Sequence, residues 1–336
     1  MKPTRHWWRN TLTWRTGPLL PLSWIFGILA EGRRRLYRAG WLEQTRLPVP
    51  VVVVGNITVG GSGKTPLVIH LARTLRERGY RPGVISRGYG GDVGGRHATR
   101  EVLPDCAPRD CGDEPLLIRR RTGCPVFIGA ERAAAGIALL AMHPGVDIII
   151  ADDGLQHLQL ARDYEIAVFD ARGCGNGRLL PAGPLREARS RLGSVDAVVA
   201  QDGGAPDGSR ALPMTLEFDD FHALADPRKT CPAGSFATRQ SAQVAAVAGI
   251  GNPARFFAQL RGIGLTVREF PFPDHHAFAP NDLARIEAGT ILMTEKDALK
   301  CSTFGDIRAW VAPVTASVAA ELVESIVEKL LGSKTA

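Results

Sequence analysis

Signatures of membrane-spanning, zinc-binding and fibrous proteins are all missing from this sequence. No apolar run in the 336 residues reaches the ~18–20 residues that a helix needs to cross a bilayer. The six cysteines form no C-x-x-C pair, no cluster of histidines completes a zinc pattern, and no internal repeat is present. These absences exclude a polytopic membrane protein, a zinc module and a fibre. The remaining class is a globular protein of about two domains with reduced thiols.

Acidic residues are scarce at the N-terminus, and this imbalance accounts for the basicity of the whole chain. The chain has 41 Lys and Arg residues against 34 Asp and Glu residues, a net charge of +7. The first 50 residues hold nine basic residues against two acidic ones, Glu31 and Glu43. Charge confined to one segment predicts an anionic partner for it, either a membrane surface or a nucleic acid. The nine basic residues are Lys2, Arg5, Arg9, Arg15, Arg33, Arg34, Arg35, Arg38 and Arg46.

An apolar stretch in the same segment favours a membrane surface. Residues 16–30 carry no charge, and five of the six tryptophans lie within the first 41 residues. Tryptophan rings prefer the headgroup level of a bilayer and arginines prefer anionic phosphates, so we predict an amphipathic helix on an anionic membrane surface. The alternatives are an ordinary helix packed on the domain and a signal or anchor segment. No nucleic-acid-binding motif accompanies the charge, so we predict no nucleic-acid partner.

A phosphate-binding loop is the strongest signal in the chain. A buried strand predicted at Val51–Val54 runs into GNITVGGSGKTP, and a helix is predicted from Pro66. Glycines let backbone N–H groups surround phosphate oxygens, and the helix N-terminus adds partial positive charge. Thr58 stands where the G-x-x-x-x-G-K-[ST] template has glycine. The alternative to a phosphate-binding loop is a glycine-rich turn that binds no ligand. The predicted nucleotide-binding residues are Thr58, Gly60, Gly61, Ser62, Gly63, Lys64 and Thr65.

Two adjacent carboxylates follow another predicted strand. The strand at 147–151 runs directly into Asp152 and Asp153. Successive side chains of a strand point to opposite faces, so one of the two is expected to face a Mg²⁺ ion that the Thr65 hydroxyl also binds. The alternative for the pair is a turn or a helix cap.

Strands and helices alternate along the chain from Val49 onward. This alternation predicts an α/β fold, with a P-loop NTPase-like parallel sheet, helices on both of its faces and a second, smaller α/β lobe. Gly, Pro, Asp and Ser concentrate between Gln201 and Gln243, which predicts a connector. The predicted strands are 51–54, 84–86, 124–129, 147–151, 165–170, 197–200, 244–250, 266–270 and 291–294, and the predicted helices are 66–78, 131–143, 253–261 and 317–331.

The phosphate loop alone is compatible with a kinase and with a nucleotide-dependent switch or metallochaperone that acts through a protein partner. Guanine recognition typically uses [NT]-K-x-D, but residues 294–297 read TEKD, with the lysine one place late. Val59 stands where MinD-like ATPases carry a lysine. A kinase needs a base and donors around the transferred phosphoryl group. Polar strings that could supply them occur at 86–91, 112–115, 154–157, 177–187 and 272–276.

Taken singly, these strings have structural alternatives, such as a helix cap for Asp113 or a core position for His157. Taken in order, they resemble the tetraacyldisaccharide 4′-kinase family of lipid A biosynthesis. The resemblance implies transfer of the γ-phosphoryl group of ATP to the 4′-hydroxyl of a tetraacylated glucosamine disaccharide 1-phosphate, which gives lipid IV(A). It also implies two α/β lobes joined by a β-ribbon. The strings that carry it are GNITVGGSGKTP, SRGYGG, GDEP, DDGLQH, GRLLPAGPLRE, FPDHH and MTEKDALK.

The resemblance also assigns roles to individual residues. Asp113 and His275 correspond to the catalytic pair. In this pair Asp113 accepts the hydroxyl proton, and His275 orients Asp113 or tunes the pKa of Asp113. His276 stays a competing candidate for the role of His275. The metal and phosphate positions correspond to Lys64, Thr65, Asp152 and Asp153. The substrate-binding or supporting positions are Arg87, Tyr89, Glu114, Arg132, His157, Arg186, Glu187 and Asp274.

Four segments are therefore expected. They are a membrane-surface helix segment at 1–46, a P-loop kinase lobe at 47–205, a connector with short strands at 206–243, and a second α/β lobe with a C-terminal helix at 244–336. ATP and Mg²⁺ are the expected cofactors, and the lipid A disaccharide precursor and an anionic membrane surface are the expected partners. The implied location is peripheral, at the cytoplasmic face of the bacterial inner membrane. Neither the residues nor the resemblance indicate an oligomeric state.

Overall fold

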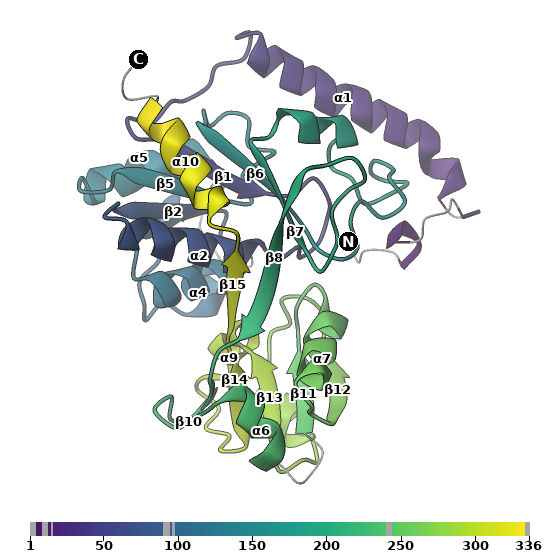
Figure 1. Ribbon diagram of the computed structural model, residues 1–336, viewed down its shortest axis with the longest axis vertical. Coiled ribbons are helices and arrows are strands. Elements are labelled where there is room, and N and C mark those ends of the chain that lie inside the picture. The colour runs from purple at the N-terminus through teal and green to yellow at the C-terminus, as the bar shows by residue number, and fades with distance from the viewer. Residues whose placement is uncertain are drawn as a thin grey trace.

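Two β-sheets form the cores of two lobes (Figure 1). The computed structural model describes residues 5–8, 13–14, 16–89, 95, 98–239 and 244–332. Among these residues, the larger lobe holds a nine-stranded sheet and the smaller lobe a six-stranded sheet. Except for 317–331, each predicted strand and helix is present within two residues at each end.

The larger sheet is parallel at its centre. In order across the sheet, its strands are β15 (Val314–Val318), β8 (Ala211–Phe218), β7 (Ala197–Gln201), β6 (Tyr164–Phe169), β1 (Val51–Gly55), β5 (Ile148–Asp152), β2 (Pro82–Ser86), β4 (Val126–Gly129) and β3 (Thr99–Glu101). Strand β1 pairs in parallel with both β5 and β6. Antiparallel pairs close the edges, β3 with β4 and β15 with β8. The central strands therefore end together at one edge, where ligands bind in sheets of this kind.

Helices cover both faces of this sheet, as predicted. Side chains alternate between the faces along β1, since Val52 and Val54 join one apolar cluster while Val51 and Val53 join another. The first cluster also receives apolar side chains of α2 (Lys64–Glu77), α3 (Pro108–Cys111), α4 (Asp113–Thr122) and α10 (Glu321–Gly332). The second cluster receives apolar side chains of α5 (Arg132–Met142). The short helix η3 (Arg189–Ser194) precedes β7 in the chain.

The smaller lobe repeats the α/β arrangement on a smaller scale. Its strands follow the order β10 (Thr230–Cys231), β9 (Phe221–Ala223), β14 (Ala309–Ala312), β13 (Ile291–Thr294), β11 (Val244–Ala248) and β12 (Val267–Pro271). The four strands from β14 to β12 are parallel. Its helices are α6 (Ala233–Arg239), α7 (Pro253–Gly262), α8 (Pro280–Ala284) and α9 (Glu295–Cys301).

Two of the predicted segment boundaries are wrong. The expected connector at 206–243 is divided between the sheets, because β8 belongs to the larger one while β9 and β10 belong to the smaller one. The C-terminal end of the chain returns to the larger lobe, where β15 pairs with β8 and α10 packs on the first apolar cluster. Residues 317 and 318 belong to β15, and α10 begins only at Glu321. Pairing partners so far apart in sequence leave no local signal. The β8–β15 pair forms the ribbon that runs between the lobes (Figure 1).

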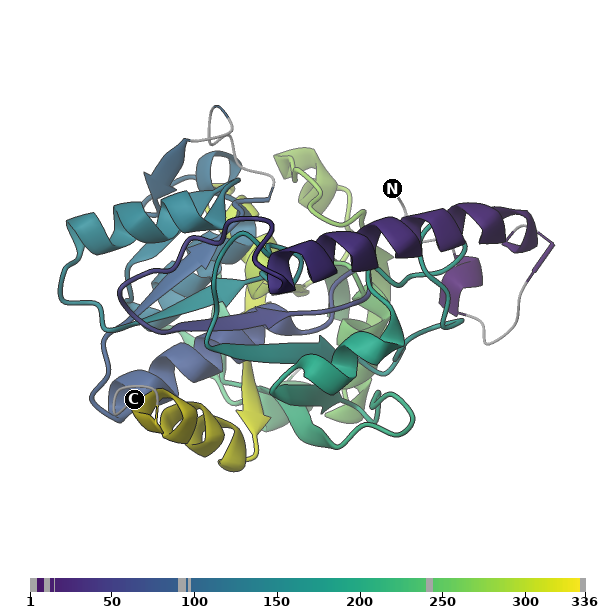
Figure 2. The same cartoon turned by 90° about the horizontal axis from the view of Figure 1, so that it is seen from above.

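The N-terminal part includes two short 3₁₀ helices, η1 (Arg5–Trp8) and η2 (Gly17–Leu19), and the long helix α1 (Leu20–Arg38). Helix α1 lies across the larger lobe, on the side away from the smaller one (Figures 1 and 2). The Ser23 hydroxyl fastens it by donating to the carbonyl of Leu179 over 2.8 Å. No helix in the described part of the chain has the length and apolar character that a bilayer span requires. The basic residues Lys2, Arg9 and Arg15 lie outside the described residues.

We predict that Ile326→Ala lowers the free energy of unfolding of the protein by about 2–5 kcal/mol, because Ile326 is fully buried in the core of the larger lobe. Urea titration measures this change. Glu328→Ala, on the exposed side of the same helix, is the matched control and should cost less than about 0.5 kcal/mol. Equal costs for the two variants would contradict the packing of α10 on the larger sheet.

Candidate active site

The phosphate loop lies between β1 and α2, at the carboxyl edge of the larger sheet. Gly63 has φ +83°, a left-handed conformation that glycine adopts without strain, and it caps the N-terminus of α2. Nζ of Lys64 lies 3.4 Å from Oδ1 of Asn56 and 3.4 Å from Oδ1 of Asp153. The Ser62 hydroxyl is buried and has no hydrogen-bond partner among the described residues. Together with the helix N-terminus, these groups form a site suited to phosphate.

Thr58, which stands where the template has glycine, lies in a contact that braces the loop. Its hydroxyl accepts a hydrogen bond from Nδ2 of Asn56 over 3.3 Å, and its backbone pairs with Leu185 in an antiparallel bridge. The neighbouring N–H of Val59 donates to the carbonyl of Pro184 over 2.9 Å. The polar string at 177–187 therefore runs along the phosphate loop.

Asp152 and Asp153 lie beside this loop, as predicted. Asp152 is the last residue of β5, and Asp153 has φ +50°, so the chain leaves the strand between them. Oδ2 of Asp152 accepts a hydrogen bond from Oγ of Ser86 over 3.1 Å, whereas its buried Oδ1 has no hydrogen-bond partner within the described residues. Asp153 forms ion pairs with Lys64 and Arg186, each over 3.4 Å.

The surroundings separate the acidities of these two carboxyl groups. Burial, followed by the charges of Glu114 and Asp153, raises the pKa of Asp152 to about 7. Burial would also raise the pKa of Asp153, but Lys64 and Arg186 outweigh it and lower that pKa to about 2. Full ionisation of Asp152 at neutral pH therefore calls for a further cation nearby.

Mg²⁺ fits this set of oxygen atoms. It prefers hard oxygen ligands and is usually held by one or two carboxylates together with nucleotide phosphates. The partnerless oxygen of Asp152 is one such ligand, and the Thr65 hydroxyl belongs to the first turn of α2. In the described part of the chain, no group of three or more His, Cys, Asp or Glu side chains could hold a metal ion. The donors thus suit an ion that arrives with a nucleotide.

Asp113 of the larger lobe meets His275 of the smaller lobe. Asp113 begins α4 and is only 3% exposed, and its Oδ2 lies 3.1 Å from Nδ1 of His275. His275 has φ +58°, a conformation that costs about 1–2 kcal/mol for a residue with a side chain. Backbone strain of this kind persists where the surroundings impose it, and it is concentrated at functional sites.

Cations from the smaller lobe keep Asp113 ionised. Burial would raise the pKa of Asp113, but Lys296, His275 and Lys300 outweigh it and hold the pKa well below its ordinary value. The hydrogen bond to Asp113 in turn raises the pKa of His275. At neutral pH, Asp113 is therefore a carboxylate, the form that accepts a hydrogen bond from a hydroxyl group.

Two lysines of α9 complete this cluster, although neither was among the predicted site residues. Nζ of Lys300 lies 3.2 Å from Oδ2 of Asp113, and Nζ of Lys296 donates to Oε1 of Glu114 over 2.7 Å. Both lysines belong to the MTEKDALK string. The string itself does not reveal that these lysines pair with acidic residues of the other lobe.

The two adjacent histidines have different surroundings. Nε2 of His276 lies 3.1 Å from Oδ2 of Asp282, and its ring lies 4.8 Å from that of Phe272, so His276 belongs to the packing of the smaller lobe. His275 is the one that contacts the acid of the other lobe. Asp274 lies 3.8 Å from Nε2 of His275, on the opposite side of that ring from Nδ1.

Tyr89 lies next to this cluster, Arg87 lies next to Tyr89, and Arg132 and His157 lie near Arg87. The exposed ring of Tyr89 lies 5.8 Å from that of His275 and 5.6 Å from the guanidinium carbon of Arg87. Arg132 is buried at the start of α5, and its Nε and Nη2 have no hydrogen-bond partner in the described part of the chain. Burial, together with Arg132 and Arg87, lowers the pKa of His157 to about 3 and keeps it neutral. The free N–H groups of Arg132 suit an anion.

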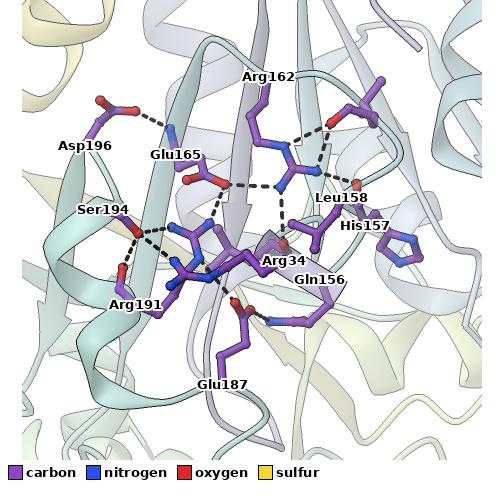
Figure 3. A network of polar contacts seen from close by, with 12 residues as sticks. Arg34, Gln156, His157, Leu158, Arg162, Glu165, Glu187, Arg191, Ser194 and Asp196 are labelled. Carbon is purple, nitrogen blue, oxygen red and sulfur yellow. Dashed lines mark hydrogen bonds and ion pairs between the residues drawn. The ribbon is translucent and has the colours of Figure 1, made fainter. Parts of the chain in front are cut away.

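Glu187 supports the site through a polar network (Figure 3). Its Oε1 accepts a hydrogen bond from Nε2 of Gln156 over 2.7 Å, and its Oε2 accepts one from Nε of Arg191 over 3.2 Å. Arg191 also donates to Oγ of Ser194 over 2.8 Å, and Arg34 of α1 donates to the same oxygen over 3.2 Å. The network thus joins α1 to the loop that follows β5.

A cavity of about 120 Å³ lies between the phosphate loop and the smaller lobe. Residues 61–65 line one side of it, and Arg255, Phe256 and Lys296 are among those that line the other. Nη1 of Arg255 donates to Oε1 of Gln201 over 2.7 Å, which joins α7 to the end of β7. Residues of both lobes therefore line this cavity, next to the phosphate loop.

Comparisons with known proteins decide the family. The family model of tetraacyldisaccharide-1-P 4′-kinase matches residues 16–331. The chain belongs to this family. The tetraacyldisaccharide 4′-kinase of Azoarcus sp. is 52% identical over 326 residues, 94% of each chain, and that of Chromobacterium violaceum is 50% identical over 97% of each. The crystal structure of the "apo" form of LpxK from Aquifex aeolicus in complex with ATP has a TM-score of 0.79 and 28% identity, covering 94% of this chain and 99% of that one.

Membership of the tetraacyldisaccharide-1-P 4′-kinase family confirms the resemblance predicted from the motifs. It favours a kinase over the switch or metallochaperone that the phosphate loop alone left open. The TEKD string at 294–297, which only partly matches the guanine-recognition pattern, is a helix cap in this kinase-family fold. Its Thr294 hydroxyl accepts a hydrogen bond from the N–H of Asp297 over 3.2 Å, at the start of α9.

We predict that Gly63→Ala weakens ATP binding by about 5–30-fold, the effect of about 1–2 kcal/mol of left-handed strain. The added Cβ would lie 2.9 Å from Oε1 of Gln201, so the loop would relax away from its phosphate-binding form. Isothermal titration calorimetry with ATP measures the change. Gly289→Ala is the control, because a Cβ there has open space and no positive φ. Unchanged ATP affinity in Gly63→Ala would argue against a phosphate site at this turn.

Proposed function

We propose that this protein transfers the γ-phosphoryl group of ATP to the 4′-hydroxyl of tetraacyldisaccharide 1-phosphate, a step of lipid A biosynthesis that yields lipid IV(A). The observation that carries the proposal is the 3.1 Å contact between Asp113 and His275, which joins the two lobes next to a phosphate-binding loop. Family membership supplies the identity of the acceptor.

ATP occupies the phosphate loop in this proposal. Backbone N–H groups of residues 60–65 surround the phosphate oxygens, and Lys64 neutralises charge on the β- and γ-phosphates. Asn56 and Asp153 hold Lys64 at this loop. Two N–H groups of Arg132, which have no partner within the described ranges, supply further positive charge for the transferred group.

The transfer step needs positioning more than covalent participation by the protein. The acceptor oxygen bonds to the γ-phosphorus while the bond between that phosphorus and the β–γ bridging oxygen breaks, and ADP leaves. The hydroxyl proton moves to the carboxylate of Asp113. His275 holds this carboxylate in place through Nδ1. Tyr89 and Arg87, beside the histidine, contact the sugar and its phosphate.

Mg²⁺ completes the site as a finer part of the proposal. We assign its protein ligands to Asp152, Asp153 and the Thr65 hydroxyl, because an oxygen of Asp152 is buried and has no partner among the residues that the structure describes. When bound, the ion neutralises negative charge that builds up on the phosphate oxygens. Arg186 keeps Asp153 in place beside Lys64.

We further propose that the protein works as a peripheral protein at the cytoplasmic face of the bacterial inner membrane. Helix α1 supports this location, because Trp24, Ile28 and Leu29 are 64%, 72% and 67% exposed. Exposed arginines, among them Arg33 and Arg35, lie on the same helix. Apolar and cationic groups combined on one helix suit an anionic leaflet, where the acyl chains of the acceptor also reside.

The decisive experiment gives the purified protein ATP, Mg²⁺ and the tetraacylated disaccharide 1-phosphate. The proposal predicts an ATP-dependent bisphosphorylated lipid, detected by mass spectrometry. Omitting the lipid tests the switch alternative, since a switch hydrolyses nucleotide without an acceptor. ATP hydrolysis at the same rate with and without the lipid, and no lipid product, would refute the kinase assignment.

We predict that Asp113→Asn lowers kcat by about 10²–10⁴-fold, the range for losing a positioned acid–base group. ATP affinity should stay close to that of the wild type, because Asp113 lies on α4 and not on the phosphate loop. Steady-state kinetics and calorimetry measure the two quantities. Near-normal kcat in Asp113→Asn would remove this residue as the base.

We also predict that the pair Trp24→Glu and Ile28→Glu reduces binding to anionic phospholipid vesicles by at least about tenfold, because the two exposed side chains lose their apolar contact with the bilayer. Vesicle sedimentation measures the binding, and ATP affinity should persist. Ile307→Glu is the control, since Ile307 is 84% exposed on the smaller lobe. Equal vesicle binding by the double variant and the control would leave α1 as a packing helix only.

A further inference from the structure

The hydrogen-bond capacity of Asp113 is almost fully used. A carboxylate offers about four acceptor positions, two on each oxygen. Oδ2 has two partners, Nδ1 of His275 at 3.1 Å and Nζ of Lys300 at 3.2 Å. Oδ1 accepts the N–H of Glu114 over 2.9 Å. Among the described residues, the position left for an incoming hydroxyl is therefore on Oδ1.

Lys300 is fixed in place by the smaller lobe. Its side chain is 11% exposed, and its Nζ also lies 3.4 Å from Oδ1 of Asp297, which is fully buried. Asp297 is held in turn, because its Oδ2 accepts hydrogen bonds from the N–H of Gly249 over 2.9 Å and from the Thr294 hydroxyl over 2.7 Å. The ammonium group thus reaches Asp113 from a rigid support at the ends of β11 and β13.

We propose that Lys300 is a positioning residue of the transfer reaction, which acts with His275 to occupy Oδ2 of Asp113 and leave Oδ1 for the acceptor hydroxyl. The inference rests on the proposed role of Asp113 as the base. If the ion pair between Lys300 and Asp113 served only to join the lobes, the lysine could contact either carboxylate oxygen of Asp113. Here the lysine and the histidine share one oxygen, and both come from the smaller lobe, so the base is aligned only when the lobes are together.

Loss of Lys300 has a defined effect on the pH dependence of the reaction. The charged and titratable groups that face Asp113 are His275, Lys300 and Lys296 from the smaller lobe, Glu114 next to it, and Asp274 beyond the histidine. Removing one cation at 3.2 Å makes the carboxylate easier to protonate. Because the base acts in its ionised form, kcat/KM then begins to fall at a higher pH on the acidic side.

The experiment compares Lys300→Met and Lys300→Arg with the wild type across the pH range, using ATP and the disaccharide lipid. We expect Lys300→Met to lower kcat by about 10²-fold, the cost of a misplaced catalytic group, with the KM for ATP unchanged. The acidic limb of the pH profile, where kcat/KM falls as the pH decreases, should move to higher pH by about one unit or more in this variant. Lys300→Arg keeps the charge, so its limb should stay at the wild-type position. Lys329→Met, on the exposed side of α10, is the control.

A wild-type pH profile and kcat in Lys300→Met would overturn the inference, as would a fall in kcat with no movement of the acidic limb. Thermal unfolding checks the fold of each variant, and Lys300→Gln provides the same comparison if the methionine variant is unstable. Failure of the proposed function is distinguishable, because then the wild type itself would give no phosphorylated lipid, or Asp113→Asn would be fully active.

Discussion

Buried carboxylates need cations, and this requirement organises the whole cleft. The larger lobe supplies the acids, with Asp113 and Glu114 at the start of α4 and Asp152 at the end of β5. The smaller lobe supplies much of the compensating charge, from Lys296 and Lys300. Asp113 and Glu114 pair with lysines of the other lobe, so these two acids keep those partners only while the two lobes are in contact.

The same requirement explains why the nucleotide site and the acid–base site differ in construction. The phosphate loop is local, since β1, the glycine-rich turn and α2 follow one another within one stretch of chain. Asp153 keeps Lys64 in place, and the loop at 177–187 braces the turn from the other side. The proposed acid–base pair, Asp113 and His275, comes instead from elements that lie far apart in the sequence and meet where the lobes are in contact.

Helix α1 belongs to the same polar framework. Arg34 on its inner side shares the hydroxyl of Ser194 with Arg191, and Arg191 holds Glu187 next to Gln156 (Figure 3). The outer side of the helix exposes Trp24 and Ile28. One helix thus presents apolar groups away from the protein and is anchored by charged hydrogen bonds to the loops behind the nucleotide site. This arrangement supports the proposed location of the protein at a membrane surface.

The sequence by itself determined the features that neighbouring residues encode. Val51–Val54 predicted a doubly buried strand, and the glycines around Lys64 predicted the turn after it, because burial patterns and backbone freedom are local properties. The resemblance to the kinase family implied that Asp113 and His275 are partners, but the sequence alone did not separate His275 from His276. The tertiary structure alone decided that His275 and not His276 faces the acid, that Lys300 joins them, and that β15 and α10 return to the larger lobe. These facts depend on the path of the chain through space, since an ion pair or a strand pairing between distant segments leaves no trace in the residues on either side of it.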